Sequence, residues 1–292
     1  MATPTPLKLG SKLPKLENAT LLLALTGWMD GGEVSTGTVK QIMGRSEVKR
    51  IATIAPDDFY IYNFPGSMEI AALFRPHVRY DDGIVERIEM PSNIFWADEA
   101  RNLVFFVGKE PNLKWQSFAD CIFTLAKQAG VSRIVFMGSF GGSVPHTREP
   151  RLYGSVSHER LKDELAKYGV RLSDYEGPGS FASLLLHEAV RHDVEMLSFV
   201  AEIPGYLEGV NPLSIEAISK RLARMLNQPI DAAAMRKVST EWENRVTQAV
   251  QKDDDLAATI RKLEEAYDNE LIGAETDEAD EAEDEAEAEE ES

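Results

Sequence analysis

Short hydrophobic runs alternate along this sequence with longer segments in which hydrophobic residues recur every three or four positions. Five runs of about five residues are bounded by turn residues and have the composition of buried strands. They are Leu21–Leu25, Arg50–Ile54, Leu103–Gly108, Arg133–Gly138 and Met196–Ala201. Two further runs, Phe59–Asn63 and Ile84–Met90, alternate between hydrophobic and polar residues and predict an edge hairpin or flap.

Helical patterns lie between these strands. The clearest covers Asn112–Ala129, where Trp115, Phe118 and Ile122 share one face and Gly130 follows as a stop signal. Further helices are predicted over 157–168, 180–192 and 214–226. Because strands alternate with helices, we expect an α/β fold with a mostly parallel sheet and helices on both of its faces.

The C-terminal part of the sequence has a different pattern. From Asp231 to Leu271 only helical periodicity remains, with a break at Asp253–Asp255, which predicts a helical hairpin packed on the core or on a neighbouring subunit. Beyond Gly273 no hydrophobic side chain is larger than alanine, so that tail should be disordered. We therefore expect an extension over 1–17, a core domain over 18–230, a helical hairpin over 231–272 and an acidic tail over 273–292.

The charge is concentrated at the C-terminal end. The net charge is -18, and residues 275–292 supply 12 acidic and no basic residues, which leaves a mildly acidic body. Such a body has no basic surface for phosphates, so we expect no nucleic-acid and no membrane partner. The sequence has a single cysteine, Cys121, which excludes an intrachain disulfide. The first fifteen residues lack the hydrophobic stretch of a secretory signal peptide, which favours a cytoplasmic location.

Standard catalytic and metal-binding signatures fail on their spacing. The glycines around Ser139 lack the pattern of a nucleophile elbow, because Met137 stands two residues before the serine. His187 and His192 are five residues apart and diverge on a helix, whereas a shared zinc ion needs a separation of four. The sequence thus predicts no catalytic residue, no metal site and no cofactor.

Polar residues do follow the predicted strands. A ligand or partner pocket at the carboxyl ends of parallel strands would include Trp28, Asp30, Glu110, His146, Arg148 and Tyr206. In one interpretation Arg148 binds an anion there. In the other the residues are structural: Asp30 caps the following helix and Glu110 pairs with Arg148.

Five motifs occur in order along the chain: Gly27–Gly32, Glu110-Pro111 with Trp115 and Phe118 after it, Val144–Arg148, Gly177–Gly179 and Ile203–Tyr206. In this order they resemble the proteasome assembly chaperone 2 family in its bacterial, actinobacterial-like form, over roughly 18–250. The resemblance implies a three-layer α/β/α sandwich similar to nucleoside phosphorylases. It also implies a homo-oligomer, with a trimer as the expected form, and a cytoplasmic setting.

Three functional hypotheses remain open. In the first, the protein is a non-enzymatic, assembly-chaperone-like interaction protein linked to the proteasome, with proteasome subunits as partners. In the second, it is an enzyme or a binding protein for a nucleoside, nucleotide or phosphate, with the strand-end pocket as its site. In the third, it is a structural oligomer in which the acidic tail acts on other chains.

Overall fold

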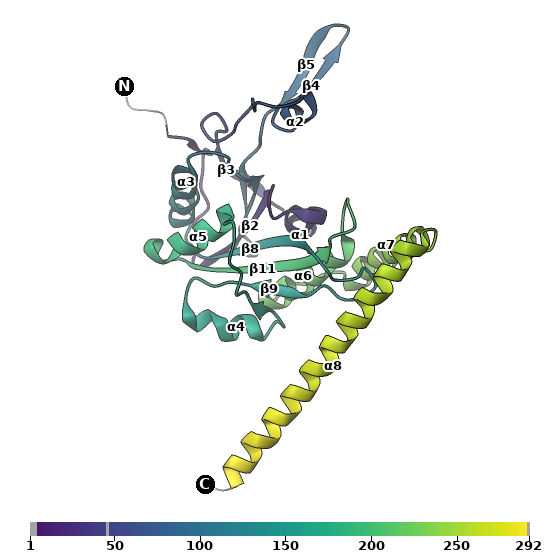
Figure 1. The fold of residues 1–292 in the computed structure, drawn as a ribbon. Coiled ribbons are helices and arrows are strands. Elements are labelled where there is room, and N and C mark those ends of the chain that lie inside the picture. Colours follow the sequence, from purple (N-terminus) through teal and green to yellow (C-terminus); the bar gives the residue numbers. More distant parts are fainter. Residues whose placement is uncertain (1–4, 45–46, 291–292) are drawn as a thin grey trace.

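The computed structural model describes residues 5–44 and 47–290, with side chains placed as far as Gly273. Within these residues a nine-stranded sheet has the order β1-β3-β6-β7-β2-β8-β11-β9-β10 (Figure 1). Its middle consists of the parallel strands β7 (Leu103–Lys109), β2 (Ala19–Thr26), β8 (Val131–Gly142) and β11 (Glu195–Pro204). Their carboxyl ends therefore lie along one edge of the sheet.

The outer parts of the sheet are mostly antiparallel. On one side β6 (Ile94–Asp98), β3 (Lys49–Ile54) and β1 (Leu7–Leu9) follow in antiparallel order. On the other side β9 (Leu152–Gly154) is antiparallel to β11, and β10 (Arg171–Leu172) is parallel to β9. The five strands predicted from buried runs are all present, but the sheet is mixed, because parallel pairing is confined mainly to its centre.

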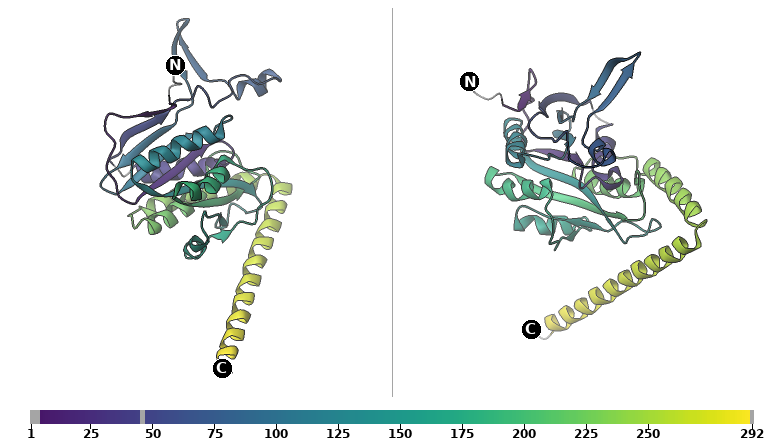
Figure 2. Two further views of the ribbon diagram at one scale, coloured as in Figure 1. Left: turned by 90° about the vertical axis from the view of Figure 1, so that its left-hand side faces the viewer. Right: turned by 45° about the horizontal axis from the view of Figure 1, so that its top comes forward.

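The central strand β2 explains the layered architecture. Leu21, Leu23 and Leu25 pack in one hydrophobic cluster with residues of α3 (Trp115–Gln128) and α5 (Phe181–Ala189). Leu22 and Ala24 pack in a second cluster with residues of α1 (Val34–Met43) and α6 (Pro212–Met225). Since successive side chains of a strand point to opposite faces, the molecule is a three-layer α/β/α sandwich with helices on both sides of the sheet (Figure 2).

Some helix boundaries agree with the predicted ones and others differ. The hydroxyl of Ser180 accepts a hydrogen bond from the N–H of Ser183 at 3.1 Å, so α5 starts where it was predicted. Helix α6 starts earlier than predicted, because Asn211 accepts the N–H of Ser214 at 3.0 Å and Pro212 opens the helix. The segment 157–168 forms only a turn, η2 (Glu159–Leu161), and a short helix, α4 (Lys162–Ala166). Two more turns, η1 (Gly31–Glu33) and η3 (Val190–His192), flank α1 and α5.

The predicted strand over Phe59–Asn63 is wrong. These residues form a turn followed by irregular chain, and Phe59 and Tyr60 are both buried although they are consecutive. The ring of Phe59 packs edge-to-face on Phe118 with centroids 4.9 Å apart, and the hydroxyl of Tyr60 donates to the carbonyl of Lys109 at 2.6 Å. The hydrophobic pattern here reflects two anchors in the core, not a pleated strand.

The predicted helical hairpin is confirmed. Helix α7 (Ala232–Val250) packs against α6, and α8 (Asp254–Glu290) turns back and extends away from the sheet (Figure 1). No helix in the described part of the chain, α8 included, is both long and hydrophobic enough to cross a membrane. The backbone of α8 continues as a helix past Gly273 to Glu290, and the disorder of the acidic tail stays a prediction.

A separate arm projects from the sandwich. It consists of the short helix α2 (Met68–Ala72) and the antiparallel hairpin β4 (His77–Asp81) and β5 (Ile84–Glu89) (Figure 1). The hairpin contains most of the predicted flap Ile84–Met90. None of the residues 63–90 is buried, so the arm stands free of the hydrophobic core.

Two helix-ending glycines allow a matched test of this packing. Gly130 and Gly169 both have positive φ values, of +71° and +65°. A Cβ at Gly130 would overlap the carbonyl oxygen of Leu16, whereas a Cβ at Gly169 would meet nothing within 4 Å. We expect Gly169→Ala to lower the free energy of unfolding by about 1 kcal/mol and Gly130→Ala to lower it by about 2 kcal/mol or more. Urea unfolding measures both, and equal losses would contradict the overlap.

Candidate functional site

The six residues predicted at the strand ends fall into two groups. Trp28, Asp30 and Glu110 lie near the ends of β2 and β7. In the second group, His146 and Arg148 follow β8 and Tyr206 follows β11. His146 bonds to Tyr206, and both His146 and Arg148 bond to the C-terminal hairpin. The two groups have different partners and are described in turn.

Glu110 joins two elements through backbone hydrogen bonds. Its Oε2 accepts the N–H of Trp28 at 3.0 Å, and its Oε1 accepts the N–H of Phe181 at 2.8 Å. The carboxylate thus links the turn after β2 to the first residue of α5. Gly27 is required beside it, because the φ of Gly27 is +136° and a Cβ there would lie 3.0 Å from the Glu110 side chain.

Asp30 has the capping role that one interpretation of the sequence assigns to it. Its Oδ1 accepts the N–H of Thr36 at 3.0 Å, and its Oδ2 accepts the Thr36 hydroxyl at 2.9 Å. Burial raises the pKa of the Asp30 carboxyl above its usual value, while the bonds from Thr36 oppose that rise. The side chain is directed to the first turns of α1.

Arg148 binds carboxylates of its own chain. Its Nε donates to Oδ1 of Asp268 at 2.7 Å, and its Nη2 donates to Oδ2 of Asp268 at 2.8 Å. Its Nη1 lies 3.8 Å from Oε1 of Glu264. The predicted pair of Glu110 and Arg148 is therefore wrong: Glu110 contacts backbone amides, and Arg148 forms a two-pronged pair with α8. An anion would have to displace Asp268 to reach this guanidinium.

His146 is the buried counterpart of that contact, with 1% of its surface exposed. Its Nδ1 lies 2.8 Å from the hydroxyl of Tyr206, and its Nε2 lies 3.0 Å from the hydroxyl of Thr247 on α7. The Tyr206 hydroxyl also accepts the backbone N–H of His146 at 2.9 Å. Trp242 of α7 meets the imidazole edge-to-face. The ring therefore joins the loop after β8 to the loop after β11 and to α7.

Further contacts extend this junction along α8. Arg151 donates to Glu202 at 3.1 Å and to Glu270 at 2.5 Å, and its guanidinium lies 4.5 Å from the ring centroid of Tyr267. Arg171 binds the same Glu270 at 2.5 Å. Five contacts of this kind fasten α7 and α8 to the core, and we call them the clasp. They are His146–Thr247, Thr147–Glu264, Arg148–Asp268, Arg151–Glu270 and Arg171–Glu270. The clasp holds the hairpin on its own core.

The acidic half of the clasp was missed from the sequence. The residues that pair are about 100 to 120 positions apart, so no local spacing reveals them. A weak signal does exist: Glu264 and Asp268 are four apart and share a helix face, as do Tyr267 and Glu270, which are three apart. Two of the basic partners, Arg148 and Arg151, are three residues apart, and the third, Arg171, lies twenty residues further along the chain.

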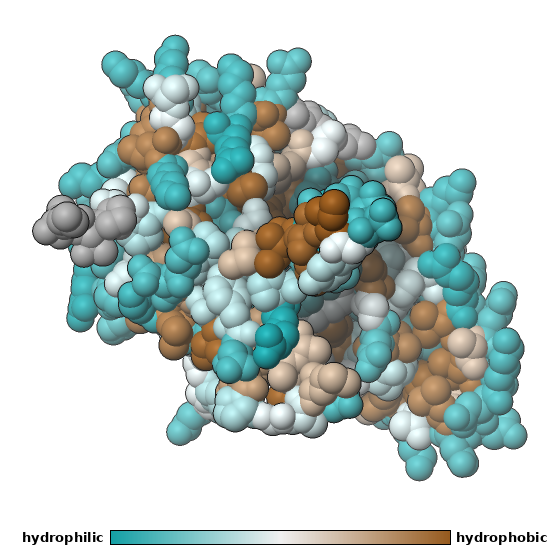
Figure 3. All heavy atoms as spheres, turned by 90° about the horizontal axis from the view of Figure 1, so that it is seen from above, coloured by the Kyte–Doolittle hydropathy of each residue, from teal (hydrophilic) through white to brown (hydrophobic). Residues whose placement is uncertain are grey.

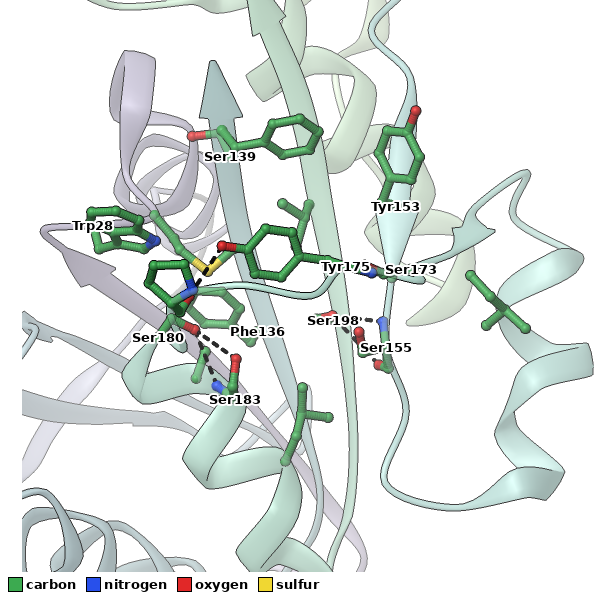
Figure 4. Close-up of a pocket in the computed structure, with 18 of the residues that line it drawn as sticks. Trp28, Phe136, Ser139, Tyr153, Ser155, Ser173, Tyr175, Ser180, Ser183 and Ser198 are labelled. Carbon is green, nitrogen blue, oxygen red and sulfur yellow. Dashed lines mark hydrogen bonds between the residues drawn. The ribbon is translucent and has the colours of Figure 1, made fainter. Parts of the chain in front are cut away.

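A cavity of about 660 Å³ lies next to this edge of the sheet, between α5, β8, β11 and the segment 172–180 (Figure 4). Trp28 is the predicted site residue that lines it. The other lining residues combine aromatic rings with hydroxyl groups, among them Phe136, Ser139, Tyr153, Tyr175, Ser180 and Ser198. Sequence reasoning missed the cavity because serines and a glycine-proline loop carry no spacing that distinguishes a pocket from a turn.

Other reactive groups offer little for catalysis. Among the described residues, no group of three or more His, Cys, Asp or Glu side chains is placed to hold a metal ion. Cys121 is buried on α3, and this burial raises the pKa of its thiol to about 11, so the thiolate is scarce near neutral pH.

The α/β/α sandwich with its C-terminal helices is similar to several solved structures. Rv2714 of Mycobacterium tuberculosis, described as of unknown function, aligns with a TM-score of 0.80 at 21% identity over 94% of this chain and 93% of that one. Rv2125 of the same organism, described as a proteasome-assembly chaperone homologue, aligns with a TM-score of 0.72 at 23% identity over 82% and 99%. PbaA of Pyrococcus furiosus, an archaeal homolog of proteasome-assembly chaperone, aligns with a TM-score of 0.58 at 17% identity over 90% and 100%. At these identities the similarity shows the fold alone.

The sequence itself matches the model of the PAC2 family over residues 24–250, which is most of the chain. The protein therefore belongs to the PAC2 family, in agreement with the resemblance found in its motifs. No curated protein matches the sequence.

The clasp gives a first prediction for this region. We expect Arg148→Met to speed hydrogen exchange in residues 254–272 of α8, because it removes both bonds to Asp268. A double-mutant cycle with Asp268→Asn should show that the two changes are coupled, because each removes the same pair of hydrogen bonds. The exposed pair Lys162–Glu159 serves as control and should show little coupling. Unchanged exchange in α8 would contradict the clasp.

The buried imidazole gives a second prediction, on pH. Desolvation holds the pKa of His146 below its ordinary 6.5, while Glu264 and Glu243 act in the opposite direction. As pH falls below 6.5, the unfolded chain takes up the proton before the folded one, so stability present above that pH is lost. Lowering the pH from about 7.5 to about 5.5 should lower the Tm more in the wild type than in His146→Gln, whose amide does not titrate. The same pH dependence in both proteins would rule out His146 as its source.

Proposed function

We propose that this protein is a non-enzymatic, assembly-chaperone-like member of the PAC2 family that acts by binding protein chains, including copies of itself. Structures described as proteasome-assembly chaperone homologues share its fold, which supports this proposal. The finer parts of the proposal are a homo-oligomer in the form of a trimer, a cytoplasmic location and proteasome subunits as partners. A pocket role for the six strand-end residues is not needed for it.

The exposed arm is the observation that carries the proposal. Met68, Leu73 and Ile84 expose 83%, 77% and 73% of their surface. Figure 3 looks onto this end of the molecule and shows hydrophobic residues gathered on the part that projects toward the viewer. Exposed hydrophobic patches of this kind mark surfaces that other chains cover. A lone two-stranded hairpin is also marginally stable in water, so the arm gains from a partner.

The two faces of the hairpin differ in chemistry. In the register of β4 and β5, Val78 lies opposite Ile88 and Tyr80 lies opposite Val85, so these four side chains share one face. The other face carries Arg79 opposite Arg87 and His77 opposite Glu89, with Ile84 opposite Asp81 next to the turn. The hairpin is therefore an amphipathic ribbon that presents one hydrophobic side.

The strand-end polar residues support a non-enzymatic role. Asp30, Glu110, His146 and Arg148 are the ionisable residues that sequence analysis placed at this edge. Each of them bonds to groups of its own chain: a helix start, two backbone amides, two hydroxyls and α8, respectively. These bonds stabilise the fold, which supports a role of these residues in structure.

A pair of matched variants tests the arm. Tyr80→Ser with Ile88→Ser removes the two largest side chains of the hydrophobic face, and Arg79→Ser with Arg87→Ser changes two residues of the opposite face in the same way. We expect light scattering after gel filtration to give about three times 32.5 kDa for the wild type and the arginine variant, and 32.5 kDa for the first variant. A wild-type protein that stays at 32.5 kDa at tens of micromolar would contradict self-association.

The same variants test the link to the proteasome. An affinity-tagged wild type expressed in its native host should co-purify with subunits of the 20S core particle, and the Tyr80/Ile88 variant should recover less of them. If deletion leaves core-particle assembly unchanged and no subunit co-purifies, the proteasome link is wrong, while self-association is judged by mass alone.

A further inference from the structure

The 660 Å³ pocket beside α5 has the size of a small-molecule site. It is separate from the arm and from the clasp. Its lining contains one charged side chain, Asp174, and no lysine or arginine among the residues described. A phosphate or carboxylate group would enter without a counter-charge and would lose its hydration, which makes anionic ligands poor occupants.

Aromatic side chains line several sides of the pocket. Trp28 exposes 68% of its surface at the end of β2, and Tyr175 also exposes 68% on the opposite wall. Figure 4 shows Tyr175 pointing across the pocket toward Trp28. Phe136 and Tyr153 complete the walls. Such faces favour a flat ring, which gains contact area and ring–ring attraction on insertion.

Hydroxyl groups supply neutral polar contacts on two sides of that space. On α5, the hydroxyls of Ser180 and Ser183 lie 3.1 Å apart. On the sheet, the hydroxyl of Ser198 accepts the N–H of Ser155 at 2.9 Å. The Ser180 hydroxyl also accepts the N–H of Ser183, and the Ser198 hydroxyl also donates to the carbonyl of Ser155 at 3.5 Å. A hydroxyl has one donor and two acceptor positions, so each of these groups keeps a position that can bond to a ligand.

The segment over the pocket is open and glycine-rich. Residues 171–179 are all exposed, and the Tyr175 hydroxyl donates to the carbonyl of Pro178 at 3.3 Å. A Cβ at Gly177 would overlap that hydroxyl, so the glycine permits this folded-back position of Tyr175. Because this hydrogen bond is long, the Tyr175 ring can move against a ligand at a small cost in free energy.

We propose that this pocket binds a small uncharged molecule that carries a flat ring with hydroxyl or amide groups, and that it excludes the phosphorylated form of the same molecule. The ring lies between Trp28 and Tyr175, and its polar groups bond to the serines of α5 and of the sheet. This site is independent of the proposed chaperone-like function. It also differs from an anion site at Arg148, whose guanidinium binds Asp268.

The test uses matched pairs that differ by one phosphate: adenosine, uridine, pyridoxine and riboflavin with their 5′-monophosphates. Calorimetry and thermal shift at about 1 mM measure binding to the wild type, because a ligand that binds the folded state raises the Tm. We expect at least one uncharged member to bind at least ten times more tightly than its phosphate. If no uncharged member binds, or if the phosphates bind as tightly, the proposal is wrong.

Two variants locate the binding. Ser183→Trp fills the pocket from an exposed position of α5, and His187→Trp, one turn further along the same helix and outside the lining, is its control. The first should weaken binding at least tenfold and the second should not. If Ser183→Trp misfolds, tryptophan fluorescence gives a second test. The ligand should quench this fluorescence in the wild type but not in Trp28→Phe. Equal quenching in both would place the ligand elsewhere.

Discussion

The burial of β2 on both of its faces is the constraint on which the rest of this structure depends. Leu21 to Leu25 are all buried, and their alternation assigns one helix layer to each side of the sheet. Pairing with β7 and β8 on its two edges then fixes where the neighbouring strands end. The turn at Gly27, the caps at Asp30 and the bridge at Glu110 all sit at that end, so their geometry follows from the packing of one strand.

The polar residues at the strand ends form hydrogen bonds that hold this framework together. Each helix that starts there leaves backbone N–H groups without partners inside the helix, and Asp30 and Glu110 accept some of them. The loop after β8 has a different task, since His146 and Arg148 hold α7 and α8. A row of polar residues beyond parallel strands therefore has two structural uses in this fold: it caps helix starts and it holds the C-terminal helices. The open pocket lies beside that row and is lined mainly by residues without charge.

Much of the fold could be predicted from the sequence, and the reasons for the failures are physical. Buried strands such as Leu103–Gly108 and the helix ending at Gly130 have strong local patterns, and both are confirmed. Helix α1 has no such pattern, because Ser35, Thr36 and Thr38 are buried polar residues that make its inner face look like a loop. Strand β6 was not predicted either, although it pairs antiparallel with the next strand, β7, across a short turn.

The candidate site was only partly predictable. Trp28, Asp30 and Glu110 do gather near one strand end, because parallel strands align their carboxyl ends. The partner of Arg148 could not be deduced, since Asp268 lies 120 residues away and its position depends on how the hairpin turns back. The pocket was equally hidden, because its walls come from the ends of strands, one helix and a loop that local periodicity does not bring together.

The amphipathic arm restricts the symmetry of any assembly it forms. If the hydrophobic face of one arm met the same face of another, a two-fold axis would pass between them and the assembly would stop at a dimer. A ring of three requires that each arm reach a different surface of the next copy. Every subunit would then both give an arm and receive one, and the receiving surface would lie on the sandwich or the C-terminal helices. Assembly would link the arm of one subunit to the folded core of its neighbour, so that a change in either would be felt around the whole ring.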